Sequence, residues 1–422
     1  MSKRVDPVDV LVVGGGPAGG AAAYWLALGG YRVILVEAAA GLRDRVCGDA
    51  LTPEAVGSLY QIGVEPESLG GHRHIGLRMS AHGRSVELPW PTDSDHPDHS
   101  MAVRRSTLDH QILERVKGVG ATVWTGTTAT EPIVEAGHLR GCRLDGTGLG
   151  SGPKGHSEVR ARYVVIADGP LSHLGRALGT ARRRTYAQGI AVRGYVTAPS
   201  HAAPWMESAF DLRDSAGEQL PGYGWVVPMG DGTLNVGVGL LSHHYGNEAL
   251  APEDLFRQWL HQIPPRWEIS PEDLLDPPVG GRLPMGGSVS PRSGPNWVVV
   301  GDAAGSVNPF NGDGVGPALA NGQLAAQILS DALITDDGLV LRRYEAEMNS
   351  RYARHYRLGR VATRTLGRPG LIRRITRLGM RSPALCGLTL RVASTLHRSG
   401  GGGPSDRVAR VAQRVVSWMP GD

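Results

Sequence analysis

The sequence predicts an α/β protein in which a Rossmann-like domain carries an inserted antiparallel β-sheet and ends in a helical C-terminal region. Three observations predict this fold. A glycine-rich turn at residues 14–19 separates an apolar run from an alanine-rich segment, as in a strand, turn and helix. Residues 186–240 contain several runs that alternate in the manner of β-strands. Residues 351–398 contain 12 arginines and no acidic residue, with aliphatic residues at helical spacing.

The first glycine-rich turn has the spacing of a dinucleotide-binding site. It follows the apolar run 8–13, opens a helical pattern, and contains Gly14, Gly16, Pro17, Ala18 and Gly19. Backbone N–H groups and the helix dipole at such a turn bind a pyrophosphate. Glu37 ends the next apolar run, where a carboxylate accepts hydrogen bonds from an adenosine ribose. Together these features predict a dinucleotide site rather than an ordinary glycine-rich turn.

A second segment indicates which dinucleotide is bound. The apolar run 297–300 leads into a turn and a helical pattern at 315–333, and this segment contains Gly301, Asp302, Pro309, Gly312, Gly314 and Val315. An NAD site needs no second, distant strand, whereas FAD is long enough to cross the sheet. Asp302 would bind a ribityl hydroxyl, and the helix N-terminus would face the flavin. We therefore predict FAD as the cofactor.

The composition is that of a globular protein with two or three domains. The chain has 422 residues, of which 41% are hydrophobic and 20% charged. Its three cysteines, Cys47, Cys142 and Cys386, form no CxxC pair, which favours a reducing compartment and predicts no metal site. Seven glycines and a proline interrupt the uncharged stretch Val10–Tyr31. We therefore expect no signal peptide, no membrane span and a cytoplasmic location.

The order of the elements predicts two interleaved domains. A hairpin pattern around His82-Gly83 and the alternating runs 190–196, 205–211, 223–228 and 234–240 lie between nucleotide-binding elements. The FAD-binding domain is expected to comprise residues 1–73, 101–180 and 285–340. The β-sheet domain, expected to bind the substrate, comprises residues 74–100 and 181–284, and a basic helical region comprises 341–422.

The order of the motifs along the chain resembles a known family. The glycine fingerprint is followed by Cys47-Gly48-Asp49-Ala50-Leu51, Val103-Arg104-Arg105, Ala167-Asp168-Gly169 and Gly301-Asp302. This order resembles the FAD-dependent enzymes of the para-hydroxybenzoate hydroxylase fold, and among them the geranylgeranyl reductase family, over about residues 8–335. The resemblance implies that Cys47, Gly48, Asp49, Arg105 and Asp168 contact FAD. If the motif aligns with an offset of one residue, the contact with FAD falls to Arg104 instead of Arg105.

One strand pattern carries the resemblance to the reductases in particular. The run Tyr223-Gly224-Trp225-Val226-Val227-Pro228, followed by Gly237 and Gly239, is similar to the family's YxWxFP motif and glycine pair, with Val227 in place of Phe. Alternation along a strand places Tyr223 and Trp225 on one face. The resemblance implies that Tyr223, Trp225, Pro228, Gly237 and Gly239 line the substrate site. Without the glycine pair, the pattern would instead indicate that the two aromatic side chains pack in the hydrophobic core.

The resemblance implies an FAD-dependent reductase that saturates a C=C bond of a polyprenyl chain. The chain is most similar to the actinobacterial branch that reduces one isoprene unit of menaquinone, and a prenyl phospholipid or pigment precursor is the alternative substrate. Two other classes of protein share the FAD-binding fold. One is a flavin monooxygenase or halogenase, and the other is a non-enzymatic FAD-bearing lipid-binding protein. The electron donor is left open between NAD(P)H and another reductant.

The chemistry of an isolated alkene suggests roles for three side chains. Hydride addition to such a bond requires protonation of the other carbon, so positive charge develops in the site. Cys47, Tyr223 or an ordered water would supply the proton. The π faces of Tyr223 and Trp225 would stabilise the charge. A lone cysteine is often only a small buried hydrophobe, so packing is the alternative for Cys47.

The basic C-terminal region predicts contact with a membrane surface. A helix at 371–380 would place Leu371, Ile372, Ile375 and Leu378 on one face and Arg373, Arg374 and Arg377 on the other. Such a helix suits the surface of an anionic bilayer, whereas the alternative is a helical lid packed on the body. Residues 400–404 are expected to link to a last helix at 406–419. The net charge of +4 and these patterns point to lipid headgroups and to no nucleic acid, so the cytoplasmic protein is expected at the inner face of the membrane.

Overall fold

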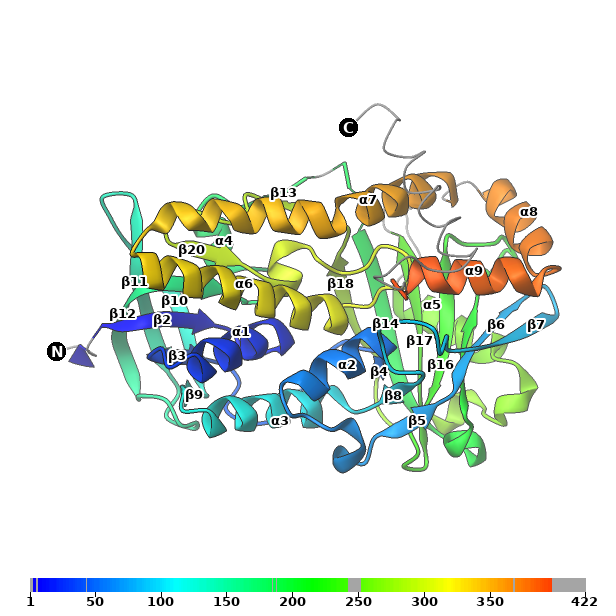
Figure 1. Ribbon diagram of the computed structural model, residues 1–422. Coiled ribbons are helices and arrows are strands. Elements are labelled where there is room, and N and C mark those ends of the chain that lie inside the picture. Colours follow the sequence, from blue (N-terminus) through cyan, green and yellow to red (C-terminus); the bar gives the residue numbers. More distant parts are fainter. Residues whose placement is uncertain are drawn as a thin grey trace.

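The computed structural model describes residues 3–4, 7–42, 44–183, 185–186, 188–241, 252–366 and 369–396. Figure 1 shows two β-sheets at opposite ends of an elongated molecule, with long helices along one side. The helices are α1 (Pro17–Leu28), α2 (Pro53–Gln61), α3 (Arg105–Gly118), α4 (His173–Ala177), α5 (Pro252–Gln262), α6 (Val315–Thr335), α7 (Arg342–Leu366), α8 (Pro369–Gly379) and α9 (Pro383–Ala393).

The first sheet combines a parallel core with an antiparallel extension. Its strands are β1 (Lys3–Arg4), β2 (Val8–Val13), β3 (Val33–Val36), β9 (Thr122–Trp124), β10 (Thr127–Glu135), β11 (His138–Gly146), β12 (Gly155–Ile166) and β20 (Trp297–Val299). The end of β12 pairs in parallel with β2 and β20, while its beginning pairs antiparallel with β11. The glycine-rich turn and Gly301-Asp302 therefore follow strands of one parallel sheet, as the Rossmann-like prediction requires.

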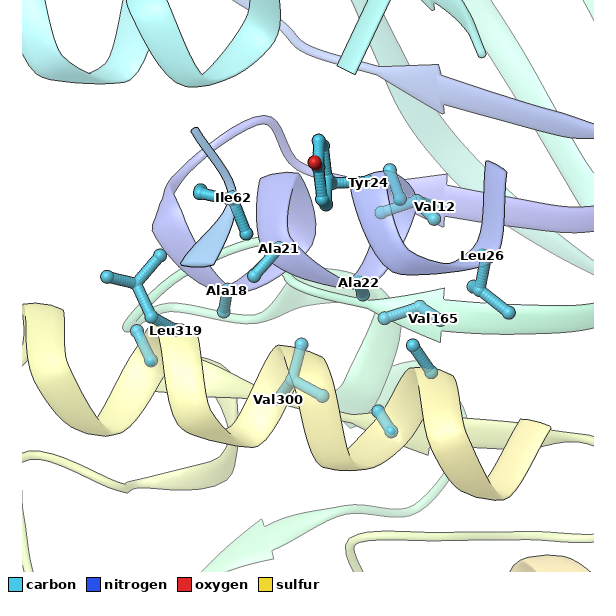
Figure 2. Close-up of a cluster of buried hydrophobic side chains, with 14 of the residues drawn as sticks. Val12, Ala18, Ala21, Ala22, Tyr24, Leu26, Ile62, Val165, Val300 and Leu319 are labelled. Carbon is cyan, nitrogen blue, oxygen red and sulfur yellow. The ribbon is translucent and has the colours of Figure 1, made fainter. Parts of the chain in front are cut away.

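The helices α1 and α6 pack closely over this sheet. Figure 2 shows Ala18, Ala21 and Ala22 of α1 facing α6 above Val165 and Val300. Gly322 of α6 permits this approach, because a Cβ there would lie 2.3 Å from the carbonyl oxygen of Ala18. Small residues on both helices thus bring their N-termini to the same edge of the sheet.

The second sheet has seven strands in the order β18-β14-β17-β16-β15-β6-β7. They are β6 (Gly76–Ala81), β7 (Arg84–Pro89), β14 (Gln188–Thr197), β15 (Trp205–Ala209), β16 (Gly222–Pro228), β17 (Thr233–Leu241) and β18 (Val279–Pro284). The predicted hairpin around His82-Gly83 is β6–β7. The sheet is not purely antiparallel, because β15 pairs in parallel with β6. These two strands come from separate insertions, so no hairpin connection dictates their direction.

Two small sheets complete the strand list. One consists of β4 (Ala50–Leu51), β8 (Ser100–Ala102) and β5 (His72–His74), and the other of β13 (Ala181–Arg182) and β19 (Val289–Ser290). The β4–β8 pairing attaches the segment that follows Cys47 to the segment that precedes Arg104 and Arg105. Two motifs that lie far apart in the sequence are thereby brought together.

The C-terminal helices cover both halves of the molecule. Helix α7 packs on the first half through buried Tyr344 and Tyr356, whereas α8 and α9 lie beside β6 and β7 at the other end (Figure 1). Among the helices in the described part of the chain, none is both long and apolar enough to cross a membrane. The predicted linker at 400–404 and helix at 406–419 lie outside the described residues.

Candidate active site

The glycine-rich turn is shaped by close backbone contacts. Gly14 has a positive φ of 107°, and a Cβ there would lie 2.2 Å from the carbonyl oxygen of Ala167. A Cβ on Gly19 would lie 1.9 Å from the carbonyl oxygen of Gly14, so only glycine fits. Gly16 differs, because a Cβ there would meet no atom within 4 Å. The space beside Gly16, at the N-terminus of α1, fits a pyrophosphate.

Glu37 completes this end of the site. Its carboxylate accepts hydrogen bonds from the backbone N–H groups of Gly15 at 2.8 Å and Ala39 at 3.0 Å. Arg45 lies 3.8 Å from the same carboxylate. Each carboxylate oxygen can accept a second bond, so a ribose hydroxyl still has acceptors here. Glu37 therefore orders the turn as well as facing the predicted adenosine position.

At the other end of the site, two carboxylates have oxygen atoms without a partner among the described residues. Asp302 follows β20, makes no side-chain hydrogen bond to a residue in the described ranges, and lies near Gly314 at the start of α6. Burial raises the pKa of Asp302, and Arg105 and Arg45 oppose that shift. Asp168 uses one oxygen to accept from the N–H of Leu174, while its buried Oδ1 has no partner. Hydroxyls of a bound FAD would satisfy both groups, so these residues fit the cofactor.

The loop before α6 has the conformation expected of a flavin-binding turn. Gly312 has a φ of 72°, and Gly314 is the N-cap of α6, with Val315 as its first residue. Pro309 lies in the same loop, against Gly359 of α7. Burial raises the pKa of Asp313, whose carboxylate accepts from the N–H groups of Val315 and Gly316. Pro317 has no N–H group and the N–H of Ala318 donates to the carbonyl oxygen of Gly314, so the first turn of α6 is satisfied within the protein and would act on a bound flavin through its dipole.

The structure separates the two adjacent arginines. Arg105 forms a bidentate ion pair with Asp109 at 3.0 and 3.1 Å, and its charge acts on Cys47 and Asp302. Arg104 instead pairs with Asp231 and stacks on the ring of Tyr195 at 4.2 Å. The side chain of Arg105 therefore lies near residues predicted to contact the cofactor, and that of Arg104 attaches the segment to the second sheet.

Cys47 lies in a turn next to Trp225. Its Sγ accepts a hydrogen bond from the N–H of Asp49 at 3.3 Å. Burial raises the pKa of the thiol to about 11, and Arg105 partly offsets that effect. The thiol is therefore protonated at neutral pH. A Cβ on Gly48 would lie 3.4 Å from the indole nitrogen of Trp225, which places the turn against the second sheet.

A buried hydrogen-bond network holds this turn in place. Asp49, with a positive φ of 55°, accepts hydrogen bonds from the Tyr195 hydroxyl, Asn235 Nδ2 at 2.9 Å and the N–H of Arg105 at 3.0 Å. Asn235 also donates to the carbonyl oxygen of Cys47 at 2.9 Å and accepts from Trp225 Nε1 at 3.0 Å. Burial raises the pKa of Asp49, and these hydrogen bonds oppose the shift. Asp49 is thus bound by protein groups from three elements.

Sequence reasoning missed Asn235, Tyr195 and Arg193 in this network. Arg193 stacks on Tyr195 at 4.5 Å, opposite Arg104, and also hydrogen-bonds Asp44. Polar Asn235 interrupts the otherwise apolar strand Leu234–Leu240, and that was the signal available in the sequence. Its partners could not be identified, since they lie 186 and 188 residues away along the chain.

Tyr223 and Trp225 project from β16 toward the two loops that face the cofactor site. The hydroxyl of Tyr223 donates to the carbonyl oxygen of Asn311 at 2.6 Å, and the two aromatic rings lie 6.1 Å apart. Trp225 belongs to a buried apolar cluster with Ala102, Ala191, Val227 and Met229, against which Val46, Ala50, Met206, Tyr223 and Leu283 pack. An apolar surface, the Cys47 thiol and the loop before α6 therefore meet at one place.

The two glycines of β17 lie against the aromatic side chains of β16. A Cβ on Gly237 would lie 2.2 Å from the Trp225 ring, so the indole occupies the room that we expected a substrate to use. A Cβ on Gly239 would lie 3.5 Å from Tyr223, an ordinary contact distance. Pro228 ends β16, and its carbonyl oxygen contacts buried His74 at 3.0 Å. Gly237 therefore makes room for the Trp225 indole.

Comparison with known proteins agrees with this geometry. Residues 7–357 match the family described as FAD binding domain. The chain is 38% identical over 388 residues to menaquinone reductase of Mycolicibacterium smegmatis, covering 92% of this chain and 91% of that protein. It is 30% identical over 356 residues to digeranylgeranylglycerophospholipid reductase 1 of Methanothermobacter thermautotrophicus, covering 82% and 83%.

A solved structure shares the whole fold. The geranylgeranyl bacteriochlorophyll reductase-like protein of Thermoplasma acidophilum superposes with a TM-score of 0.75 at 22% identity, over 96% of each chain. The cofactor is FAD, as the matched family shows, and the unpartnered Oδ1 of Asp168 fits such a ligand. The chain therefore belongs to the FAD-binding geranylgeranyl reductase family and is an FAD-dependent prenyl reductase.

Proposed function

We propose that this enzyme saturates one isoprene unit of the menaquinone tail. The main support is the similarity to menaquinone reductase, which is 38% identical over 92% of the chain, against 30% over 82% for the phospholipid reductase. The apolar cluster around Trp225 is suited to an uncharged polyprenyl chain. A prenyl phospholipid remains the second candidate substrate.

Side chains of the site account for the protonation that such a substrate requires. FAD, when bound and reduced, supplies the hydride. The Cys47 thiol is the proposed proton donor, because its pKa of about 11 keeps the proton on Sγ at neutral pH. The nearby charge of Arg105 stabilises the thiolate that remains. The hydroxyl of Tyr223 donates to Asn311, so its proton is already engaged.

The aromatic side chains have a separate role in this proposal. Protonation of one alkene carbon leaves positive charge on the other, and the π faces of Tyr223 and Trp225 stabilise a cation. The bond from Trp225 Nε1 to Asn235 and that from the Tyr223 hydroxyl to Asn311 restrict both rings. We propose that these two side chains, with Gly239, contact the prenyl chain next to the thiol.

A reduction assay tests the substrate. The dithionite-reduced holoenzyme is mixed without oxygen with detergent-dispersed menaquinone, and separately with digeranylgeranylglycerophospholipid. We expect flavin reoxidation and, after the quinone ring has been returned to its oxidised form in air, a gain of two hydrogens that mass spectrometry locates in the menaquinone tail. Reduction of the phospholipid with menaquinone unchanged would refute the proposed substrate. Oxygen consumption in step with substrate would instead indicate a monooxygenase.

We also propose that helices α8 and α9 contact an anionic membrane surface. Ile375 is 44% exposed, Leu378 62% and Leu385 49%, while Ile372 is buried against the body. The predicted apolar face of α8 is thus divided between the protein and the solvent. Residues 351–398 contain 12 arginines and no acid, which complements anionic headgroups. Such a contact gives the enzyme access to a lipid-soluble substrate at the inner face of the membrane.

Point substitutions test this contact better than truncation. Deletion from residue 351 would remove Tyr356, whose hydroxyl donates to the carbonyl oxygen of Ser306 in the first half of the molecule. Replacing Ile375 and Leu378 with serine should weaken co-sedimentation with vesicles containing phosphatidylglycerol while FAD absorbance is kept. The matched control replaces exposed Ile334 and Leu339, on the α6–α7 side. Equal binding by both variants would refute the placement.

A further inference from the structure

We propose that a pocket between the β6–β7 hairpin and α8 binds the phosphodiester group of an anionic phospholipid in the bilayer. This inference rests on the membrane contact proposed above and makes it specific. The pocket has a volume of about 330 Å³. Its lining residues come from the hairpin and from the end of α8, and they are Ala81, His82, Arg84, Arg377, Met380 and Arg381.

Three guanidinium groups give the pocket its charge. Arg84, Arg377 and Arg381 all line it, and none of them forms an ion pair or a side-chain hydrogen bond with another residue in the part of the chain that the structure describes. Elsewhere in the molecule arginines commonly have such partners, as Arg78 has Glu87 and Arg391 has Asp93. Three unpaired guanidinium groups around one pocket form a binding site for an anion with several oxygen atoms.

The walls of the pocket are held together before any ligand binds. His82, at the tip of the hairpin, contacts Thr376 Oγ1 of α8 through Nε2 at 2.8 Å. The N–H of His82 donates to Asp211 at 2.7 Å. Behind the pocket, Met380 and Ala81 are buried in the cluster that joins α8 and α9 to β6 and β7 (Figure 1). The arginines therefore project from two fixed elements, which lowers the entropic cost of binding.

Among the described residues, Asp211 is the only acid that faces His82. Asp211 contacts the hairpin tip, whereas Arg213, Arg373 and Arg377 add positive charge around His82. Burial lowers the pKa of His82, Asp211 opposes that shift, and the three arginines add to it. At neutral pH the imidazole is therefore uncharged and contributes a polar wall rather than a cation, and the guanidinium groups alone carry the pocket's charge.

The position of the pocket suits a lipid headgroup. Helix α8, which contributes Arg377 and ends shortly before Arg381, exposes Ile375 and Leu378 to solvent. At a bilayer surface the aliphatic side chains enter the boundary between headgroups and acyl chains, while the guanidinium groups stay at the level of the phosphates. A phosphate held by the pocket would orient α8, and with it the substrate sheet, relative to the membrane.

A charge-matched comparison tests the pocket. Arg377→Gln with Arg381→Gln removes two pocket charges, and Arg373→Gln with Arg374→Gln removes two charges of α8 that do not line the pocket. If only overall charge matters, both pairs should lose equal affinity for vesicles of phosphatidylglycerol and phosphatidylcholine. We expect the pocket pair to lose about tenfold more affinity than the control pair. Arg84→Gln, on the hairpin, should weaken binding in the same way.

The remaining outcomes separate the possible failures. Equal losses in the two pairs would overturn the pocket, and failure of the wild-type holoenzyme to bind vesicles would overturn both the pocket and the membrane contact. Inorganic phosphate is tested by thermal shift at constant ionic strength. If phosphate stabilises the wild type but not Arg84→Gln while the two pairs bind vesicles equally, the pocket binds soluble phosphate and the lipid proposal is wrong. Menaquinone reduction in detergent should be the same in all variants, so these results do not depend on the proposed substrate.

Discussion

Two turns face the cofactor site, and they are held in different ways. The turn at Gly14–Gly19 is shaped by backbone contacts within the turn and with Ala167, just after β12, and these leave no room for a Cβ at Gly14 or Gly19. The turn at Cys47–Asp49 is held by side chains of the second sheet, including Asn235, Tyr195 and Trp225. A local motif thus shapes the turn predicted to bind the nucleotide, whereas tertiary contacts between two sheets place the proposed reactive thiol.

The largest expected effect tests the first turn. Gly16→Val should abolish FAD binding, with an affinity loss of at least about 2 kcal/mol, because the new side chain enters the space proposed for the pyrophosphate. The apoprotein should unfold at the same temperature as the wild type, since a Cβ at Gly16 meets no atom within 4 Å. Flavin absorbance and thermal unfolding are the measurements. Gly19→Val is the contrasting variant and should destabilise the apoprotein itself. Normal FAD content in Gly16→Val would show that the cofactor binds elsewhere.

The second prediction tests the chemistry of the Cys47 turn. Cys47→Ser should retain FAD and lower turnover roughly 100-fold, because a hydroxyl is a much weaker acid than a thiol. Formation of the saturated menaquinone tail under anaerobic conditions, followed by mass spectrometry, measures this step. Cys386→Ser, on α9, is the control and should turn over normally. An unchanged rate in Cys47→Ser would limit Cys47 to a packing role.

The third prediction tests how the turn is held. Asn235→Ala removes bonds to Trp225, Cys47 and Asp49, and should lower the free energy of unfolding by about 2–3 kcal/mol because buried polar groups lose their partners. It should also slow turnover by displacing the thiol. Asn321→Ala is the matched control, because neither amide atom of this buried asparagine has a partner in the described structure. Similar destabilisation by both substitutions would contradict a special role for Asn235.

The smallest expected effect concerns α2, which follows the Cys47 turn. Burial raises the pKa of Glu54 from 4.5 to about 7, although Thr395 donates a 2.6 Å hydrogen bond to it. Between these values the unfolded chain loses the proton and the folded protein keeps it, so stability falls as pH rises from 4.5 to 7. Glu54→Gln should remove this loss and raise stability at neutral pH by about 2 kcal/mol. Denaturant unfolding at several pH values measures the difference. If the stability of Glu54→Gln fell by the same amount between pH 4.5 and 7, another titrating group would be responsible.

Much of the fold could be predicted from local patterns. Apolar runs, glycine spacing and alternation were sufficient for the parallel sheet, α1, α6 and every strand of the second sheet except β18, because each is a regularity within a short segment. Helix α8 was also expected, at 371–380 against the observed 369–379. The parallel pairing of β15 with β6 was not expected from the sequence, since it joins two separate insertions.

The sequence by itself determined the cofactor class, because a phosphate-binding turn and its distant partner are each written in consecutive residues. Only the tertiary structure decided which of Arg104 and Arg105 lies with the cofactor residues, and that the indole of Trp225 occupies the space beside Gly237. It also revealed the bonds between Asn235 and the Cys47 turn, and the pocket formed by Arg84 and α8. The physical reason is that these contacts depend on side-chain direction between segments far apart in the chain, which no local periodicity encodes.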